Sequence, residues 1–94
     1  MANNYSDRRV VITGLGVVTP LGHDLNTFWQ NLVAGQCGID KIAAFDAAAF
    51  DTQIAGEVKN FDPAPAFPSP KEIRRTDRYS QFAVYAAWLS LIHI

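Results

Sequence analysis

Apolar side chains recur at helical spacing in the first third of the chain. They stand at i, i+3, i+4, i+7 and i+8, and they are Leu25, Phe28, Trp29, Leu32 and Val33. This is the stripe that one face of an α-helix buries. Asp24 precedes the stripe as a candidate N-cap, and Gly35 stands where a left-handed residue ends many helices. The pattern predicts a helix over residues 25–34.

A run of consecutive apolar residues before this helix predicts a β-strand. Residues 10–13 are all β-branched and the run ends at Gly14, which is typical of a short strand. Because the apolar residues are consecutive and do not alternate, we expect a strand covered on both faces inside an α/β sheet. Residues 14–22 are rich in glycine and predict a connection with turns and little helix.

The middle of the chain predicts little regular structure. Residues 36–51 mix small and acidic side chains, which favours a loop with at most a short turn around residues 47–49. Residues 52–58 predict a second strand, which Gly56 weakens. Residues 61–70 hold four of the five prolines, so we expect an extended connection there and no helix or strand.

A capping signature then predicts a second, longer helix. Ser69 can cap the first N–H groups, Pro70 suits the first helical position, and Glu72 completes a capping box. We expect this helix to run from about residue 70 into the high 80s. It would carry four cations at i, i+3, i+4 and i+7, and therefore on one helical face. They are Lys71, Arg74, Arg75 and Arg78.

Gathering four cations on one face has an electrostatic cost. Like charges at these spacings repel by about a few tenths of a kcal/mol each, and cations in a first turn oppose the helix macrodipole by another ~0.3–1 kcal/mol. Such conflicts are often found at functional sites. Spacing alone leaves two interpretations open, a surface that binds an acidic partner and a solvated face paired with acids elsewhere in the fold.

The charge balance excludes several classes of partner for the chain as a whole. Eight basic and nine acidic residues give a net charge of −1, so we expect no general attraction to nucleic acid or to anionic membranes.

The longest late apolar stretch, residues 82–94, has 13 residues, whereas a membrane span needs roughly 20. The polar start and the interrupted run after it do not form a signal peptide. We therefore expect a cytoplasmic protein without a membrane span.

Two further motifs are candidates for chemistry, and both favour structural interpretations. Gly14-Leu15-Gly16 follows the predicted strand, but a dinucleotide fingerprint needs a third glycine where Thr19 stands. A tight strand exit is therefore favoured, and we expect no cofactor. Cys37 has no cysteine partner and, with only His23 and His93 in the chain, no zinc site. The nearest histidine in sequence, His23, lies across a helix and gives no support for an activated thiol, which favours a small turn residue over a nucleophile.

Several ordered blocks resemble the beta-ketoacyl-acyl-carrier-protein synthases, the condensing enzymes of fatty acid synthesis. Residues 8–22 are similar to the opening strand and turn of that family nearly residue for residue, and the match continues to about residue 88. Within the family the resemblance is nearest to synthase II. The later blocks are Trp29 with Leu32, Ala34-Gly35, Gly38-Ile39, Phe45-Asp46, Ala55 to Val58, and Arg75 to Ser80 followed by Ala83, Ala86 and Ala87.

The resemblance implies the amino-terminal fragment of a thiolase-like α/β fold with α/β/α/β/α layers. Residues 1–7 would be a flexible tail and residues 8–88 the start of the N-terminal ketosynthase domain. Residues 89–94 depart from the family pattern, as a frameshift or an assembly artefact would make them. Cys37 stands where relatives usually have serine, which supports its interpretation as a turn residue.

The activity implied is an acyltransferase reaction of fatty acid elongation. Such enzymes condense an acyl group with malonyl-acyl-carrier protein, by decarboxylative Claisen condensation, and are usually homodimers. The resemblance places the nucleophilic cysteine and both histidines of the active site downstream of residue 94. We therefore expect no catalytic residue in this chain and no condensing activity from it alone.

One functional surface is implied within the chain. In the family, basic residues at the start of the helix near residue 70 help to dock the acidic acyl carrier protein. Lys71, Arg74 and Arg75 match those positions, and Arg78 extends the same face. Three alternatives remain: another ketosynthase (type I or polyketide), a chain-length factor without the cysteine, and a small non-catalytic module that binds an acidic partner.

Overall fold

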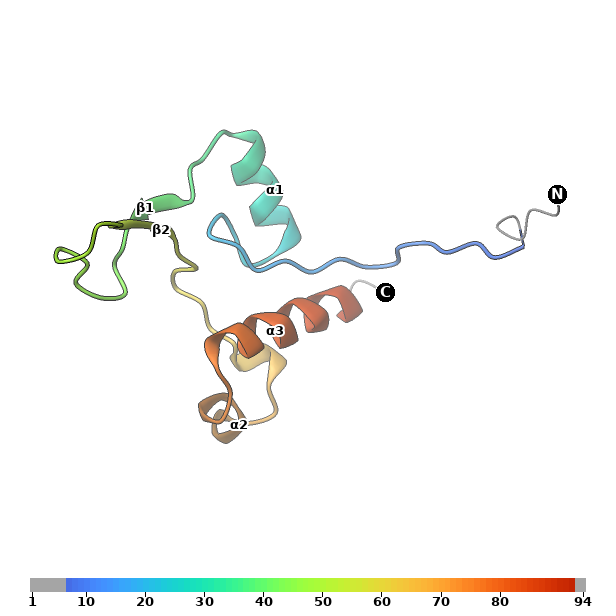
Figure 1. Cartoon of the computed structure of the whole chain (residues 1–94). Helices are drawn as coiled ribbons and strands as arrows, with labels where there is room; N and C mark the ends of the chain where they lie inside the picture. The colour runs from blue at the N-terminus through green and yellow to red at the C-terminus, as the bar shows by residue number, and fades with distance from the viewer. Residues whose placement is uncertain (1–6, 93–94) are drawn as a thin grey trace.

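The computed structural model describes residues 7–92. The predicted flexible tail, apart from its last residue, lies outside the described residues, and so do the last two residues of the segment 89–94. Helices dominate the described chain, with one small sheet (Figure 1). In chain order the elements are α1 (Leu25–Val33), β1 (Ile39–Lys41), β2 (Ile54–Gly56), the 3₁₀ helix η2 (Ala64–Ala66), α2 (Pro70–Arg74) and α3 (Arg78–Ile92).

Helix α1 confirms the first predicted helix, together with the cap at its start and the glycine after its end. Asp24 has extended backbone angles, and its carboxylate accepts a hydrogen bond from the Thr27 backbone N–H at 2.8 Å. Gly35 has a φ of +76°, in the left-handed region that glycine adopts without strain. The helix is one residue shorter than predicted because Ala34 is its C-cap.

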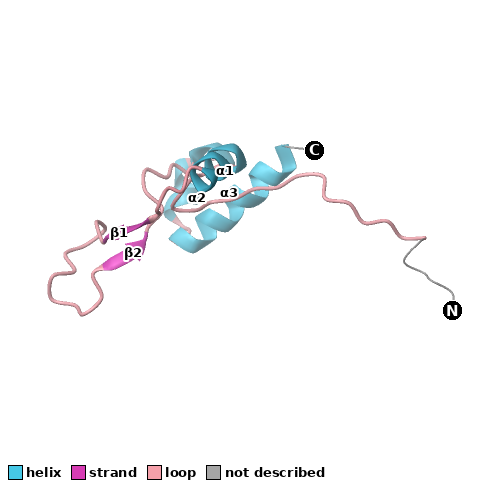
Figure 2. Ribbon diagram, turned by 90° about the horizontal axis from the view of Figure 1, so that it is seen from above, coloured by secondary structure: helices cyan, strands magenta, loops and turns pink. Residues whose placement is uncertain are grey.

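The predicted strand at residues 10–13 is wrong for this structure. The segment is extended but forms no ladder with any other part of the described chain. Val10 is 94% exposed, and Val11 and Ile12 are exposed as well. A strand is defined by hydrogen bonds to a neighbour, and no neighbour lies beside these residues. The segment instead leads away from the helices on the side opposite the hairpin (Figure 1, Figure 2).

Strands β1 and β2 form an antiparallel hairpin. Asp40 pairs with Ala55 at the centre of the register. The first strand lies in the segment predicted to be loop, and the second confirms the predicted strand over a shorter span. The turn expected around residues 47–49 is present, because the Phe50 N–H donates to the Ala47 carbonyl at 3.0 Å.

Two glycines let the segment before α1 lie against helices. A Cβ at Gly16 would stand 1.9 Å from the Ala86 carbonyl oxygen of α3, and a Cβ at Gly22 would stand 2.6 Å from the Phe28 nitrogen of α1. Neither position tolerates a side chain without backbone movement. Gly16 of the Gly14-Leu15-Gly16 motif therefore lies in a packed connection, although the predicted tight strand exit lacks its strand.

The predicted long helix is broken into α2 and α3, which corrects the sequence expectation. Ser69 caps α2 as predicted, accepting from the Glu72 N–H at 3.4 Å. The helix then ends at Arg74, and the Thr76 hydroxyl donates to the Ile73 carbonyl at 2.9 Å. Helix α3 starts anew as the Asp77 carbonyl accepts from the Gln81 N–H. The short threonine and aspartate side chains at this point favour caps and turns.

The proline-rich connection also differs slightly from the prediction. It contains the 3₁₀ helix η2, and its last residue, Pro70, begins α2. The element η2 lies against α3. Proline tolerates a first helical turn because its missing N–H would be unpaired there in any case.

The core is small and largely aromatic. The Phe61 ring is buried and meets Phe82 and Tyr85 of α3 edge-on, with centroids 5.1 and 5.0 Å away. His23 contacts the same ring at 5.4 Å. The accessible surface is 7475 Å², against about 5,400 Å² for a folded monomer of this mass. Much apolar surface is therefore uncovered in this chain.

No helix in the described part of the chain combines the length and the apolar character needed to cross a membrane.

Candidate functional site

Three of the four predicted cations lie together at the α2 corner, which is defined here as Lys71, Arg74 and Arg75. Lys71 and Arg74 belong to α2 and Arg75 is its C-cap. All three are exposed. Within residues 7–92 one ion pair lies inside 4.0 Å, and it joins Lys59 to Asp40 on the hairpin side. No carboxylate of the described chain therefore pairs with the α2 corner.

The break after α2 also changes the electrostatics of the corner. Arg74 and Arg75 are at the C-terminal end of α2, where the partial negative charge of the helix favours cations. The expected conflict with the macrodipole therefore does not apply to Arg74 and Arg75, whereas Arg78, as the first residue of α3, does lie at a helix start. The mutual repulsion of three neighbouring cations remains, and the described chain holds no acid close enough to form an ion pair with them.

Arg78 lies in a different environment and does not extend one helical face, which corrects the predicted arrangement. It begins α3, and its guanidinium carbon lies 5.2 Å from the centroids of both Phe61 and Phe82. One of its nitrogens also donates to the Val58 carbonyl at 3.4 Å. The guanidinium therefore contacts the aromatic core as well as solvent.

A residue that the sequence reasoning missed connects the two helices. Gln81 is only 9% exposed, although it is polar. Its Nε2 donates to the Ile73 carbonyl at 3.1 Å and to the Thr76 carbonyl at 3.2 Å. The signal for this role was the cap-forming pair at positions 76 and 77, which predicts a helix start four residues before Gln81.

The residues considered for nucleophilic or metal chemistry are not brought together. Cys37 is exposed, and its Sγ donates to the Ile39 carbonyl at 3.5 Å. His23 packs against Phe61, and His93 lies outside the described residues. Among the described residues, no group of three or more His, Cys, Asp or Glu side chains could hold a metal ion.

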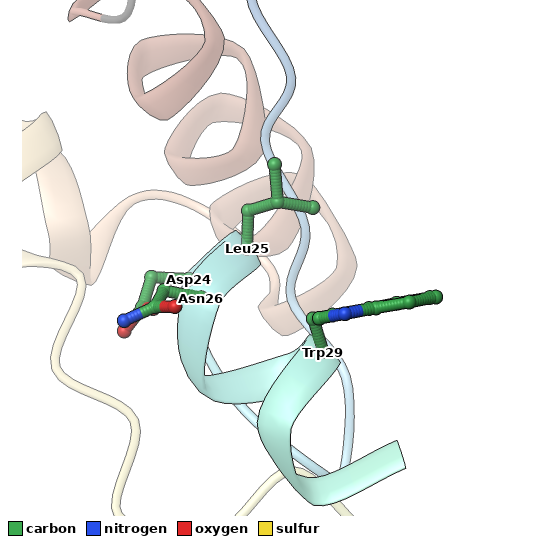
Figure 3. Close-up of a pocket in the computed structure, with 4 residues that line it drawn as sticks. All are labelled: Asp24, Leu25, Asn26 and Trp29. Atoms are coloured by element: carbon green, nitrogen blue, oxygen red, sulfur yellow. The ribbon is translucent and has the colours of Figure 1, made fainter. Parts of the chain in front are cut away.

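An open hollow lies at the start of α1 (Figure 3). It has a volume of about 580 Å³ and is lined by Asp24, Leu25, Asn26 and Trp29. Leu25 and Trp29 project away from Asp24 and Asn26 (Figure 3). The hydrogen bond from the Thr27 backbone N–H lowers the pKa of Asp24 below its ordinary value of 3.8. A carboxylate whose pKa is lowered and whose oxygens accept hydrogen bonds from Thr27 is a weak general base near neutral pH.

A second carboxylate, that of Glu57, also accepts hydrogen bonds from backbone N–H groups. Glu57 accepts the N–H of Ala43 at 2.8 Å and that of Ala44 at 3.0 Å. These two hydrogen bonds lower its pKa below the ordinary value of 4.5. The carboxylate holds the loop that leaves β1 against the end of β2. The α2 corner presents three cations of one short segment to solvent without an ion-pair partner among residues 7–92.

Comparison with known proteins decides the family. The model of the beta-ketoacyl synthase N-terminal domain matches residues 7–93. This chain belongs to the beta-ketoacyl synthase family. The resemblance inferred from the sequence blocks is therefore confirmed, and the domain of this family is thiolase-like.

Three relatives of this beta-ketoacyl synthase chain are each named 3-oxoacyl-[acyl-carrier-protein] synthase 2. The protein from Coxiella burnetii is 55% identical over 80 residues, which are 85% of this chain and 19% of the relative. The protein from Staphylococcus aureus strain COL is 44% identical over 86% of this chain and 19% of its own length. The protein from Synechocystis is 46% identical over 89% and 20%. The chain thus spans about a fifth of the relatives it matches.

Proposed function

We propose that this chain forms the N-terminal part of a 3-oxoacyl-[acyl-carrier-protein] synthase of type II, an acyltransferase of fatty acid elongation. The observation that carries the proposal is the 44–55% identity to synthase 2 proteins over 80 residues or more. The whole enzyme would join the carbonyl carbon of a thioester-bound acyl group to the malonyl methylene carbon of malonyl-carrier protein. The malonyl carboxylate leaves as carbon dioxide, and its bonding electrons form the new carbon–carbon bond. The acyl carbon–sulfur bond then breaks, and the sulfur leaves as a thiolate that takes up a proton.

In this proposal, residues 1–94 contribute no catalytic residue to the reaction. Acyl transfer needs a thiolate nucleophile, and decarboxylation needs donors aimed at a developing enolate oxygen. The exposed thiol of Cys37 donates to a backbone carbonyl, and His23 is packed on Phe61. The catalytic cysteine and two histidines would belong to a part of the enzyme beyond residue 94.

The uncovered apolar surface supports a place inside a larger layered fold. Residues 10–13 are extended and β-branched, and most of their backbone is free to pair. We place them as a strand of a thiolase-like sheet once neighbouring strands are present, in a domain that starts at about residue 8. The complete enzyme would be a cytoplasmic homodimer.

The α2 corner is the proposed dock for the acidic acyl carrier protein. Lys71, Arg74 and Arg75 are exposed and have no acidic partner among the described residues, so an acidic surface would relieve their repulsion. Arg78 would support the dock from α3, although its guanidinium also contacts Phe61 and Phe82. Each exposed charge pair is worth ~0.2–1 kcal/mol, so the binding energy is expected to be distributed.

The experiment is a double charge reversal in a full-length synthase that carries these residues. Arg74→Glu with Arg75→Glu should raise KM for acyl-carrier protein about tenfold, since two attractive pairs become repulsive. Turnover of a small pantetheine-linked substrate, which bypasses the dock, should stay unchanged.

Arg74→Glu alone is matched by the control Lys41→Glu, the same change in charge at an exposed hairpin lysine without an ion pair in the described chain. The control should leave both substrates unaffected. Equal losses with both substrates in the Arg74 and Arg75 variant would mean that these arginines hold the fold together, and the docking proposal would fail.

A further inference from the structure

The five-residue helix α2 is too short to hold its own direction. Isolated helices below about 12 residues are marginal in water, and α2 buries none of its residues. The direction in which Lys71 and Arg74 point must therefore come from whatever ties α2 to the rest of the chain.

Gln81 of α3 provides that tie. Its Nε2 donates to Ile73, inside α2, and to Thr76, in the corner that follows. The last carbonyls of a helix lack their usual partners within it, and the Ile73 carbonyl is completed by the Thr76 N–H and by the Gln81 amide. The same amide also serves the Thr76 carbonyl, which lies beyond the C-cap Arg75. The Thr76 hydroxyl also donates to Ile73, so the corner closes on itself through hydrogen bonds.

We propose that Gln81 is a positioning residue for carrier-protein binding, which acts by fixing the α2 corner against α3. The inference rests on the proposed docking function of Lys71, Arg74 and Arg75. Gln81 itself, being 9% exposed, would not touch the partner. Its loss would let α2 reorient, so the three cations would meet an acidic surface in the right arrangement less often.

The amide group is specifically suited to this geometry. A glutamine Nε2 carries two hydrogens and can satisfy two acceptors at once, whereas ionised glutamate only accepts and methionine offers no donor. Either substitution would leave the Thr76 carbonyl, on a half-buried residue, without its side-chain donor. The Ile73 carbonyl would keep the Thr76 hydroxyl but lose its link to α3.

The test compares two glutamines in the full-length synthase. Gln81→Met should raise KM for acyl-carrier protein about threefold to tenfold, which is what one hydrogen bond is typically worth. The rate constant kcat with a pantetheine-linked substrate should stay within about twofold. Gln53→Met is the matched control, because Gln53 Nε2 likewise donates to two carbonyls, those of Ala48 and Phe50, but far from α2 in sequence. It should leave KM unchanged.

A combined variant separates positioning from general destabilisation. In the Arg74→Glu, Arg75→Glu background, Gln81→Met should add little to KM, because the residues it positions are already lost. Effects that multiply, or an equal loss with the small substrate, would overturn the inference. Gln81→Glu gives the same comparison should the methionine variant not fold.

The two proposals fail in different ways. If the arginine reversal raises KM for the carrier protein but Gln81→Met and Gln81→Glu do not, the positioning role falls and the dock stands. If the arginine reversal itself leaves KM unchanged, the docking function falls and the positioning role falls with it.

Discussion

Arginines three or four residues apart along the chain do different work in this molecule. Arg74 is exposed and forms no ion pair with the described chain, whereas the Arg78 guanidinium lies 5.2 Å from two aromatic ring centroids and contacts a backbone carbonyl. A cation over an aromatic ring at an exposed site is worth about 0.5–1 kcal/mol. Charge alone does not distinguish the two residues, but their surroundings do.

These different surroundings predict that alanine substitution at Arg78 lowers stability more than alanine substitution at Arg74. Arg78→Ala should lower the free energy of unfolding of the full-length synthase by about 1 kcal/mol, whereas Arg74→Ala should stay within about 0.5 kcal/mol. Denaturant unfolding measures both. Equal stability of the two variants would remove the structural role assigned to Arg78.

At the scale of elements, α1 owes its start to one capping carboxylate with a defined pH dependence. The folded-state pKa of Asp24 is lowered, chiefly by the Thr27 N–H, so the cap stabilises the protein above the unfolded pKa and is lost as pH falls through the folded value. At pH 6, Asp24→Ala should lower the free energy of unfolding of the full-length synthase by about 1 kcal/mol. The difference in free energy of unfolding between the variant and the wild type should shrink below pH 3.8. Denaturant unfolding at each pH measures this difference. A difference that stays constant into acid would contradict the assignment of the cap.

Elements with local causes could be predicted from the sequence, and elements with distant causes could not. Helix α1 follows from its own stripe, its aspartate cap and Gly35. The strand expected at residues 10–13 depends on neighbours that the described chain does not supply. The helix expected from residue 70 onward is interrupted at Thr76 and Asp77, two residue types that favour caps and turns within an otherwise helical pattern.

The candidate site, like the elements, could be predicted from the sequence only where its cause is local. The exposure of Lys71, Arg74 and Arg75 follows from their charge, and the structure agrees. Sequence spacing placed Arg78 on the same face, but the helix break and the aromatic rings at Phe61 and Phe82 give it another environment. No local pattern shows a ring that approaches from 17 residues earlier in the chain.

At the scale of the whole molecule, the balance of buried and exposed surface is that of an incomplete core. The accessible surface of 7475 Å² exceeds the ~5,400 Å² expected for this mass, and the radius of gyration of 17.8 Å exceeds the ~12 Å of a compact domain. Large exposed apolar patches mark surfaces that are normally covered. Here they include Val10, Val11 and Trp29.

The 94-residue polypeptide on its own should therefore neither unfold cooperatively nor catalyse condensation. Calorimetry should show no sharp transition, and acyl- and malonyl-carrier protein should give no 3-oxoacyl product. A cooperative melt of the monomer would mean that the exposed surface is tolerated in isolation. Measurable product would mean that the segment contains catalytic groups that its geometry does not reveal.

The most direct test of the docking account is the rate at which acyl-carrier protein associates with the full-length synthase, measured at increasing ionic strength. Attraction between opposite charges speeds association and is screened by salt. With the native α2 corner, the association rate constant should fall steeply as salt is added. With Arg74→Glu and Arg75→Glu it should be lower at low salt and nearly independent of salt. The same steep dependence in both proteins would contradict the docking role of the α2 corner.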